Sequence, residues 1–301
     1  MDRRDAIDAS AAALMLLLTF SWGLNGVAAK LANTGFNPIF LTMARSAIAA
    51  VLVFAWCRYR GIALFGRDGS LGPGIVAGLL FGAEFSLIFI GLEYTSVARS
   101  ALLVNTMPFW ILIGAHFWLG ERMTPKKLIG LLLAFLGVVL VFSDKLSLPG
   151  PEAIVGDLLS IGAGLLWAAT TLVIKATRLV RTSAEKLLLY QLAVSSVMMA
   201  PLLPLAGPIL REPTPLSGGA LAFQAVYVVA FTYILWFWLM RRYPAAGLSS
   251  FTFLTPAFAV MCGGLLLGEP LSWKIFAALG LIAGGLVLVN RPPRQKLPAA
   301  E

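Results

Sequence analysis

The amino-acid sequence predicts an all-α polytopic membrane protein, with ten transmembrane helices arranged as two inverted five-helix repeats. Three observations support this prediction: the composition, the number of long apolar runs and an internal repeat. Of the 301 residues, 59% are hydrophobic and 12% are charged, whereas a soluble globular chain is roughly 45–50% apolar and about 25% charged. So little polar surface cannot cover a water-soluble particle, which excludes a cytosolic enzyme, a nucleic-acid-binding module and a disordered chain.

Ten apolar runs follow one another along the chain. A helix needs about 20 apolar residues to cross a hydrocarbon core about 30 Å thick, and none of the runs alternates as a membrane strand does. The remaining tail, 291–301, contains three prolines and is predicted to be a disordered cytoplasmic segment. The predicted spans cover residues 11–31, 38–57, 71–92, 96–119, 125–142, 153–174, 184–205, 218–240, 245–267 and 272–290.

Lysine and arginine residues indicate the orientation of the spans. With the N-terminus in the cytoplasm, the cytoplasmic segments hold 17 of the 23 basic residues, the opposite ends hold five, and Arg45 lies inside the second span. Cytoplasmic loops of membrane proteins carry an excess of Lys and Arg. Both termini are therefore expected in the cytoplasm, and the net charge of +9 reflects these loops rather than an acidic partner.

The chain also repeats itself. Residues 96–142 align without gaps onto 244–290, an offset of 148, with 12 identities in 47 positions. Nearer the start of each half, a tryptophan pair matches at an offset of 145. The informative matches are Pro108 with Pro256, Gly120 and Glu121 with Gly268 and Glu269, and Trp22 with Trp167.

These matches divide the chain into two repeats of five spans each, 11–142 and 153–290. Because five is an odd number, the second repeat must cross the membrane in the opposite direction to the first. Inverted repeats are typical of secondary transporters, whose substrate site lies near the membrane midplane between the halves.

The two Gly–Glu pairs lie where one predicted helix stops and the next begins. Gly120 and Gly268 suit the left-handed conformation that ends many helices, and Thr124 is a good N-cap for the helix after the first pair. Glu121 and Glu269 are each expected near the positive end of the helix that follows. This structural role explains most of the motif, and direct transport chemistry is the alternative.

The same two segments resemble a known family. Residues 119–124 read LGERMT and residues 267–272 read LGEPLS, which is similar to the paired signatures of EamA-type proteins in the drug/metabolite transporter superfamily. Within that superfamily, the chain is most similar to the YddG-type bacterial exporters of aromatic amino acids. The resemblance implies a ten-helix inverted-repeat fold in the bacterial inner membrane and export of metabolites, above all aromatic amino acids, from the cytoplasm.

Pro108 and Pro256 interrupt the fourth and ninth spans near their centres. Proline removes an intrahelical hydrogen bond and kinks a helix. Paired interruptions in the two halves of a transporter point to helices that line or gate the transport site. The alternative is a packing kink without ligand contact.

Glu84 lies near the middle of the third span. A carboxylate at that depth costs about 2.5–3.5 kcal/mol on insertion scales and usually faces the bundle interior or a wet cavity. Glu84 is therefore predicted to bind an ammonium group or to carry protons. A structural ion pair with Arg45 or Lys30 is the alternative.

Three tryptophans, Trp22, Trp110 and Trp167, lie in mid-span, where their indole faces can stack on an aromatic or cationic substrate. Bulky packing between helices is the alternative. The other five lie at span ends, where aromatic belts form. A few polar groups at similar depth complete a predicted cavity between spans one, three, four, six, eight and nine. These polar residues are Asn25, Asn105, Thr171, Tyr190, Gln224 and Tyr227.

Neither a cofactor nor a metal is expected. A single histidine, His116, excludes the usual multi-histidine metal sites, and the two cysteines imply no disulfide framework. The expected partners are a small-molecule substrate and the lipid bilayer, with proton coupling as an open alternative and no nucleic acid. Glycines spaced by four residues suit close helix packing within a monomer, and a weak homodimer is the alternative.

Other functions remain to be weighed against an aromatic amino-acid exporter. The cargo of an exporter could instead be a drug, a nucleoside or another amino acid. A membrane-embedded enzyme would need clustered titratable groups, and here the deep acids and bases are few and scattered. A scaffold or a channel is a further alternative, and saturable counterflow distinguishes a carrier from a channel.

Overall fold

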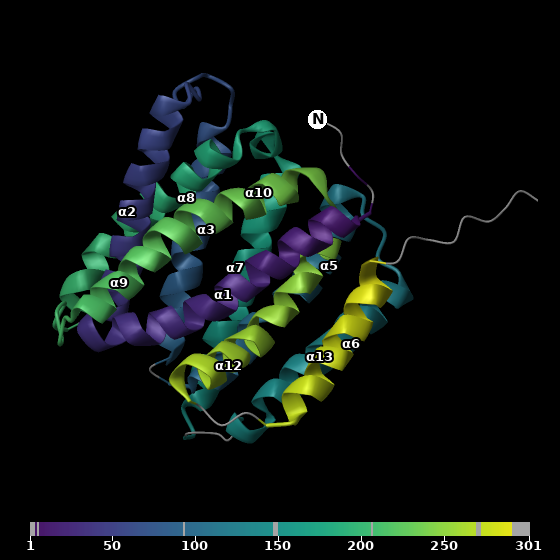
Figure 1. Ribbon diagram of the computed structural model, residues 1–301. Helices are drawn as coiled ribbons and strands as arrows, with labels where there is room; N and C mark the ends of the chain where they lie inside the picture. The colour runs from purple at the N-terminus through teal and green to yellow at the C-terminus, as the bar shows by residue number, and fades with distance from the viewer. Residues whose placement is uncertain are drawn as a thin grey trace, which may run out of the picture.

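The computed structural model describes residues 4, 6–92, 94–146, 150–205, 207–268 and 272–290. Within these residues the chain is helical, apart from connecting segments and one isolated antiparallel bridge between Phe36 and Leu210 (Figure 1). Glu269 and the tail 291–301 lie outside the described residues.

The first half contains five membrane-crossing stretches, the fourth of which is divided into two helices. They are α1 (Ala9–Gly35), α2 (Pro38–Tyr59), α3 (Leu71–Leu92), α4 (Val97–Val104) with α5 (Met107–Leu119), and α6 (Pro125–Phe142), which the short turn η1 (Ser143–Lys145) follows.

The second half repeats this order. Its elements are α7 (Ala153–Ala176) with the turn η2 (Arg178–Arg181), α8 (Ala184–Met199) with η3 (Ala200–Leu205), α9 (Pro215–Phe223) with the π-helical segment η4 (Gln224–Thr232) and α10 (Tyr233–Arg242), α11 (Ala245–Ser250) with η5 (Phe251–Phe253) and α12 (Leu254–Leu267), and α13 (Lys274–Asn290).

Nine of these stretches in the described part of the chain are long and apolar enough to cross a membrane, and α13 is a shorter apolar helix. At 1.5 Å per residue, its 17 residues span ~25 Å, slightly less than the ~30 Å hydrocarbon core. The helix lies beside α6, its counterpart in the first half (Figure 1). The predicted ten-helix fold is confirmed.

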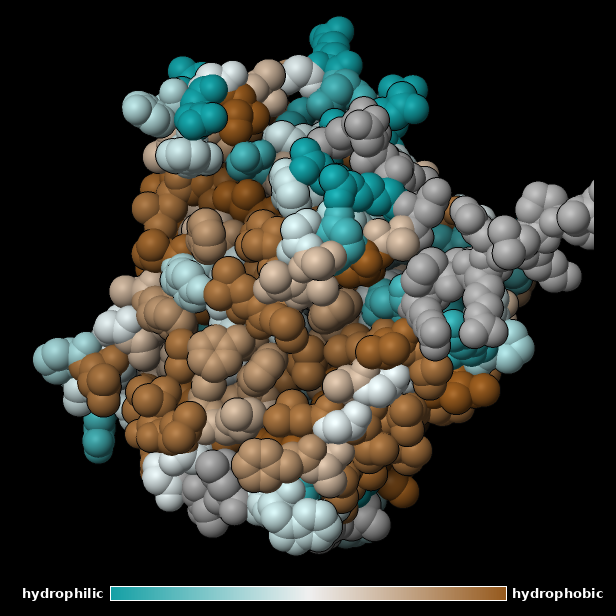
Figure 2. All heavy atoms as spheres, turned by 45° about the vertical axis from the view of Figure 1, so that its right-hand side comes forward, coloured by the Kyte–Doolittle hydropathy of each residue, from teal (hydrophilic) through white to brown (hydrophobic). Residues whose placement is uncertain are grey.

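A broad apolar surface surrounds the bundle. Figure 2 shows brown residues over the middle of the molecule and hydrophilic residues gathered toward its upper end. Large side chains on this surface are more than half exposed, including Val51 at 68%, Leu266 at 60% and Phe276 at 73%. A soluble monomer does not expose contiguous apolar surface on this scale, so lipid is its natural solvent.

The contact between α6 and α13 reveals the relation between the halves. A Cβ atom on Gly130 would meet the carbonyl oxygen of Gly285 at 2.8 Å, and one on Gly137 would meet the carbonyl oxygen of Ala278 at 2.8 Å. At the offset of 148, Gly130 corresponds to Ala278 and Gly137 to Gly285, so the two contacts are equivalent. Paired contacts of this kind define a local two-fold axis, and the antiparallel helices make the second repeat inverted.

The glycines of α3 serve packing within the chain. Cβ atoms on Gly74, Gly78 and Gly82 would lie within 3 Å of side chains of α8, namely Tyr190, Val194 and Met198. Small residues at this spacing let two helices approach closely. The stripe is therefore filled by the second half of the same chain, and self-association stays a prediction.

The first and last described segments lie at the same end of the bundle. A Cβ on Gly247, in α11, would lie 2.7 Å from Asn290 and 3.1 Å from Ile7. The backbone N–H of Arg4 also donates to the carbonyl of Arg242 over 2.8 Å. Chain ends on one side fit an even number of crossings.

The fourth and ninth spans both tighten just before their prolines. In the fourth span, Asn105 and Thr106 separate α4 from α5, and the Thr106 N–H donates to the carbonyl of Leu103, three residues back. In the ninth span, the tight turn Phe251–Phe253 separates α11 from α12. The predicted interruptions are thus present at matched positions in both halves.

Candidate functional site

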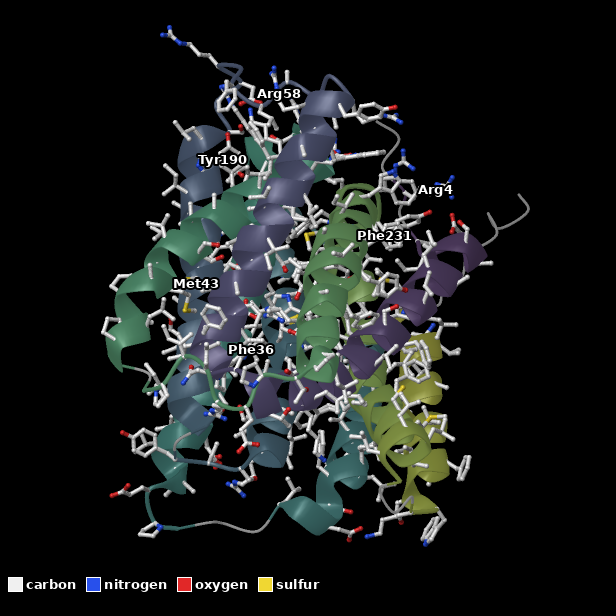
Figure 3. The ribbon with its side chains drawn as sticks, turned by 60° about the vertical axis from the view of Figure 1, so that its left-hand side comes forward. Arg4, Phe36, Met43, Arg58, Tyr190 and Phe231 are labelled. Atoms are coloured by element: carbon white, nitrogen blue, oxygen red, sulfur yellow. The ribbon has the colours of Figure 1, made fainter. Side chains whose placement is uncertain are left out.

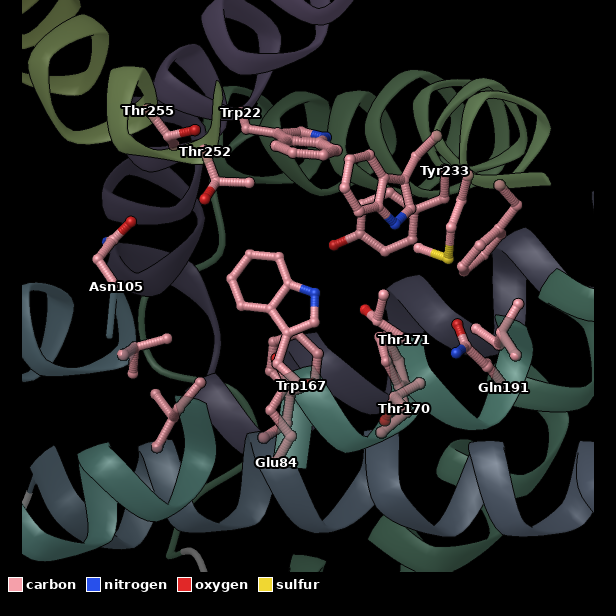
Figure 4. Close-up of a pocket in the computed structure, with 18 of the residues that line it drawn as sticks. Trp22, Glu84, Asn105, Trp167, Thr170, Thr171, Gln191, Tyr233, Thr252 and Thr255 are labelled. Carbon is pink, nitrogen blue, oxygen red and sulfur yellow. The ribbon is translucent and has the colours of Figure 1, made fainter. Parts of the chain in front are cut away.

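A cavity of about 250 Å³ lies in the middle of the bundle, beside both interrupted spans. Figure 4 shows Trp22 and Tyr233 on one side, Glu84 on the other, and the Trp167 indole projecting between them. The walls come from spans one, three, four, six, seven, eight and nine. The lining residues are Trp22, Asn25, Phe81, Glu84, Phe85, Ile88, Val104, Asn105, Trp167, Thr170, Thr171, Ile174, Gln191, Tyr233, Trp236, Phe237, Met240, Thr252 and Thr255.

Six of the residues predicted from the sequence meet in this cavity, although they come from four different spans. The repeat-matched tryptophans lie on α1 and α7, and the buried acid lies on α3. The six residues are Trp22, Asn25, Glu84, Asn105, Trp167 and Thr171.

Buried polar oxygens in the cavity wall lack partners. The atoms Asn25 Oδ1, Glu84 Oε2, Gln191 Oε1 and Thr255 Oγ1 are inaccessible to solvent and accept or donate no hydrogen bond within the described residues. Leaving a buried polar group unpaired costs about 1–3 kcal/mol, and more for a charged group. Because the four residues line one cavity, a bound molecule or water that reaches these atoms would satisfy several of them together.

Glu84 is 5% exposed and forms no ion pair within 4.0 Å in the described part of the chain. Arg45, on α2, is close enough to interact electrostatically with Glu84 and Tyr233. The Arg45 guanidinium lies 5.0 Å from the centre of the Phe85 ring, and its Nε has no hydrogen-bond partner. A nearby cation that does not contact the carboxylate balances its charge and leaves its oxygens available.

The two repeat-matched tryptophans have different surroundings. The Trp22 indole N–H donates to Thr232 Oγ1 over 3.0 Å. Its ring packs edge to face on Tyr233 and Trp236, with 6.3 and 5.6 Å between the ring centroids. Within the described residues the Trp167 indole N–H has no hydrogen-bond partner, and the side chain packs against the buried cluster that includes Met107 and Ile111. Trp22 is therefore held by a hydrogen bond, whereas Trp167 lines the cavity without one.

The backbone carbonyls that the two prolines leave without a helical donor belong to residues of the same cavity. Neither Pro108 nor Pro256 can donate to the carbonyl four residues earlier, at Val104 and Thr252. Val104 and Thr252 both line the cavity, and both prolines are buried. The interruptions therefore border the cavity, as paired interruptions in transporters do.

Two predicted residues lie on other faces of their helices. Trp110 follows Asn105 by five residues, which turns it ~140° around the helix, and it lines an outer groove with Phe117 and Trp118. Its indole N–H donates to Thr106 Oγ1 over 3.2 Å. Tyr190 precedes the cavity residue Gln191 and points away from the cavity, where its hydroxyl bonds Ser70 over 2.9 Å.

Gln224 and Tyr227 lie too early in the eighth span to reach the cavity. That span contributes to the lining only from Tyr233 onward, which is ~9 Å beyond Tyr227 along the helix axis. Tyr227 instead shares a hydrogen bond with Ser21 over 2.9 Å and stacks between Phe223 and Phe231. Gln224 is buried, and its Nε2 has no partner among the described residues.

Sequence reasoning missed several lining residues. Trp236 was expected in the aromatic belt because it lies near a span end, yet it is 5% exposed and lines the cavity. Thr252 and Thr255 directly precede Pro256, so a search around the interruptions would have found them. Nothing in the sequence distinguishes Phe81, Phe85 or Phe237 from lipid-facing aromatics.

The Gly–Glu motif ends helices as predicted, but its acid serves a different helix. Gly120 and Gly268 are left-handed, with φ of 69° and 67°, and Thr124 caps α6. The Glu121 carboxylate caps α11 rather than α6. Its oxygens accept from the backbone N–H groups of Ala245 and Ala246, over 2.8 and 3.4 Å, at the start of α11.

Lys175 completes this contact. Its Nζ lies 4.0 Å from Glu121 Oε1 and donates to the carbonyls of Met240, over 3.1 Å, and of Tyr243. Glu121 belongs to the first half and α11 to the second, so the motif joins the halves at one end of the bundle. The matching Glu269 lies outside the described residues.

This arrangement suits reversible binding of a small molecule. An apolar, aromatic wall with a few polar atoms and one carboxylate is the usual composition of a small-molecule site. Within the described residues, no group of three His, Cys, Asp or Glu side chains could hold a metal ion. The fold and the cavity define a multi-pass membrane transporter.

Comparison with known proteins gives the family. The model of the EamA-like transporter family matches residues 9–143 and again residues 154–291, and the chain belongs to this family. A crystal structure of a protein that is 21% identical superimposes with a TM-score of 0.80, over 93% of this chain and 97% of that one, and shows the same fold.

Three curated relatives cover nearly the whole chain. An uncharacterized transporter of Bacillus subtilis, YvbV, is 27% identical over 96% of this chain and 94% of its own length. A probable amino-acid metabolite efflux pump of Escherichia coli is 26% identical over 96% of this chain and 95% of its own length. An S-adenosylmethionine/S-adenosylhomocysteine transporter of Chlamydia muridarum is 27% identical over 92% of this chain and 90% of its own length.

Proposed function

We propose that this transporter exports small amphipathic metabolites with an ammonium group, aromatic amino acids foremost, from the cytoplasm of a bacterial cell. Both termini lie in the cytoplasm, because 17 of 23 basic residues then face that side. The inverted halves, 11–142 and 153–290, expose the cavity alternately to the two sides of the inner membrane.

The unpartnered oxygens in the cavity wall carry this proposal. Asn25 Oδ1, Glu84 Oε2 and Gln191 Oε1 are all acceptors without donors. A primary ammonium has three N–H donors and no acceptor. A cargo with an ammonium group therefore supplies what these atoms lack, and the carboxylate of Glu84 gives its charge a partner.

The aromatic wall suits the other end of such a cargo. The Trp167 indole projects into the cavity opposite Trp22 and Tyr233 (Figure 4). Aromatic pairs contribute about 0.5–1.5 kcal/mol beyond the area they bury. A volume of about 250 Å³ lies just below the ~300–1,000 Å³ of ordinary small-molecule sites, which favours single-ring or two-ring metabolites over bulky drugs.

The relatives support the chemical class of the cargo. One is named as a pump for amino-acid metabolites and another as a transporter of S-adenosylmethionine, an amino acid that carries an adenine ring. Nucleosides and other amino acids are the alternative cargoes. Glu84 also provides a site at which a proton could be exchanged for the cargo.

Counterflow in proteoliposomes tests the proposal. Vesicles containing the purified protein are preloaded with one candidate, and uptake of labelled phenylalanine or tryptophan is measured. We expect aromatic amino acids and aromatic amines to drive saturable uptake, with leucine and uridine weaker by about tenfold or more. Equal counterflow with uridine, or none with any amine, would contradict the proposal.

Two tryptophans provide a matched pair for this assay. Trp167 projects into the cavity, whereas Trp110 lies on the far face of its helix. We expect Trp167→Ala to abolish most counterflow and Trp110→Ala to preserve it. Equal losses in both variants would indicate general destabilisation rather than a contact with cargo.

A further inference from the structure

A second hollow, which we call the basic groove, lies at the end of the bundle that carries most of the basic residues. It has a volume of about 690 Å³ and opens between α2, the loop from α2 to α3, and α8. Figure 3 shows Arg58 and Tyr190 near this end of the molecule. Its lining consists of Phe54, Leu64, Phe65, Gly66, Arg67, Asp68, Gly69, Leu71, Arg178, Lys186, Leu189, Tyr190 and Ala193.

Two of the three cations in the basic groove are uncommitted. The side chains of Arg67 and Arg178 are exposed, and neither forms a hydrogen bond or ion pair within the described residues. Lys186 differs, because it is 4% exposed and its Nζ donates to Asp68 Oδ2 over 2.8 Å. The groove therefore presents two free guanidinium groups and no free carboxylate.

A hydrogen-bonded loop holds these charges in place. Asp68 accepts from Lys186 and from the Ser70 hydroxyl and N–H, and the Ser70 hydroxyl also bonds the Tyr190 hydroxyl over 2.9 Å. The bond from Lys186, followed by those from Ser70, lowers the pKa of Asp68. Asp68 thus stays ionised and keeps Lys186 engaged.

Gly69 allows Arg178 to lie against this loop. Its φ is +74°, which disfavours other residues, and a Cβ there would lie 2.6 Å from a guanidinium nitrogen of Arg178. A side chain at position 69 would push Arg178 away. The loop conformation therefore positions the Arg178 cation on the groove wall.

The remaining walls of the groove are apolar, and three of their side chains are well exposed. Phe54 is 42% exposed, Leu71 is 62% exposed, and Phe65, in the loop, is 85% exposed. On the α8 side, the groove is lined by the small residue Ala193. The basic groove thus combines two cations with a surface that suits hydrocarbon.

We propose that the basic groove binds an anionic phospholipid, with its phosphate at Arg67 and Arg178 and an acyl chain along Phe54, Leu71 and Ala193. Basic pockets between transmembrane helices on the cytoplasmic side suit acidic lipid headgroups. A soluble phosphate would satisfy the arginines but would leave the apolar wall uncovered, so charge and walls together favour a lipid. The site contacts both halves and shares no residue with the central cavity.

Native mass spectrometry of the full chain, released from nanodiscs of phosphatidylcholine with phosphatidylglycerol, tests this proposal. We expect one phosphatidylglycerol molecule to remain bound to the wild type. The double variant Arg67→Ala, Arg178→Ala should lose on the order of 30-fold in affinity, since each basic residue near a bilayer surface contributes about fivefold. Wild-type retention in this variant would overturn the proposal.

Two further variants separate charge loss from lipid binding. Arg122→Ala, Lys126→Ala removes two exposed charges at the same end of the bundle but outside the groove, and it should retain phosphatidylglycerol. Ala193→Trp adds a bulky side chain to the apolar wall without changing the charge. This variant should weaken the binding of phosphatidylglycerol by about tenfold. If instead glycerol phosphate displaces the lipid equally well from the wild type, the groove is an anion site and the lipid proposal fails.

Discussion

The two halves of the molecule share the same backbone features but contribute different side chains to the cavity. Both tighten in front of a matched proline, and their last helices, α6 and α13, pack through equivalent glycine contacts. By contrast, Trp22 donates a hydrogen bond to Thr232 while its repeat partner Trp167 lacks one, and among the described residues Glu84 is the one carboxylate in the wall. We infer that the matched positions build the moving scaffold and that the unmatched chemistry selects the cargo.

The largest expected effect follows from the carboxylate of the first half. Glu84→Gln removes the charge that we propose for the cargo ammonium, and hydrogen bonds to charged groups contribute about 1.5–3 kcal/mol. We expect apparent affinity for aromatic amino acids to fall by about tenfold to 100-fold, and any pH dependence of flux to disappear. Counterflow between pH 5 and 8 measures both.

A surface acid gives the control for this variant. Glu152→Gln changes an exposed residue at the start of α7, and it should transport as the wild type does. If Glu84→Gln folds and keeps the wild-type affinity and pH profile, Glu84 has no role in binding or proton exchange.

The matched tryptophans give the next largest effect. Trp167→Ala removes the indole that projects into the cavity, and we expect about a tenfold loss of affinity. Trp22→Phe removes the bond to Thr232, a loss of about 1 kcal/mol of stability, and should lower the melting temperature by a few degrees while transport persists. Thermal unfolding and counterflow on both variants sharpen the comparison, and the reverse pattern would break it.

The shared interruptions are expected to affect rate more than binding. Pro108→Ala with Pro256→Ala restores a backbone donor in each span, which favours straighter helices. Flux should fall several-fold while membrane insertion and cargo affinity persist. Pro38→Ala, at the first turn of α2, is the matched control, and full flux in the double variant would show that the interruptions are packing features alone.

The smallest effect on transport concerns the contact that joins the halves. Glu121→Gln keeps a hydrogen-bond acceptor for Ala245 but removes the charge beside Lys175. We expect a loss of about 1–3 kcal/mol in stability and a modest change in flux. Calorimetry on the variant measures the first. A variant as stable as the wild type would mean that the Lys175 carbonyl contacts suffice.

The sequence was sufficient for the parts of the fold that depend on spacing. Run length located the spans, the 148-residue offset located both interruptions, and Gly120 and Gly268 located two helix ends. The partner of Glu121 could not be found in this way, because α11 is remote in sequence and meets it only after the halves pack together.

The candidate site was predictable only in part, since depth in the membrane is readable from sequence and helix rotation is not. Trp22, Glu84 and Trp167 were found by depth. Trp110 and Tyr190 lie at suitable depths but on other faces. The eighth span also contains a π-helical stretch, Gln224–Thr232, and Trp236, which follows it, lines the cavity instead of joining the aromatic belt.

Access to the cavity from both sides tests the central claim most directly. Thr255→Cys, in a chain whose buried Cys57 and Cys262 are changed to Ser, places one thiol in the wall between the halves. A membrane-impermeant maleimide should label this thiol from the external face in whole cells and from the cytoplasmic face in inverted vesicles. Phenylalanine should slow both reactions. Labelling from a single side under all conditions, or rates that ignore the amino acid, would contradict a central cavity that alternates between the two faces.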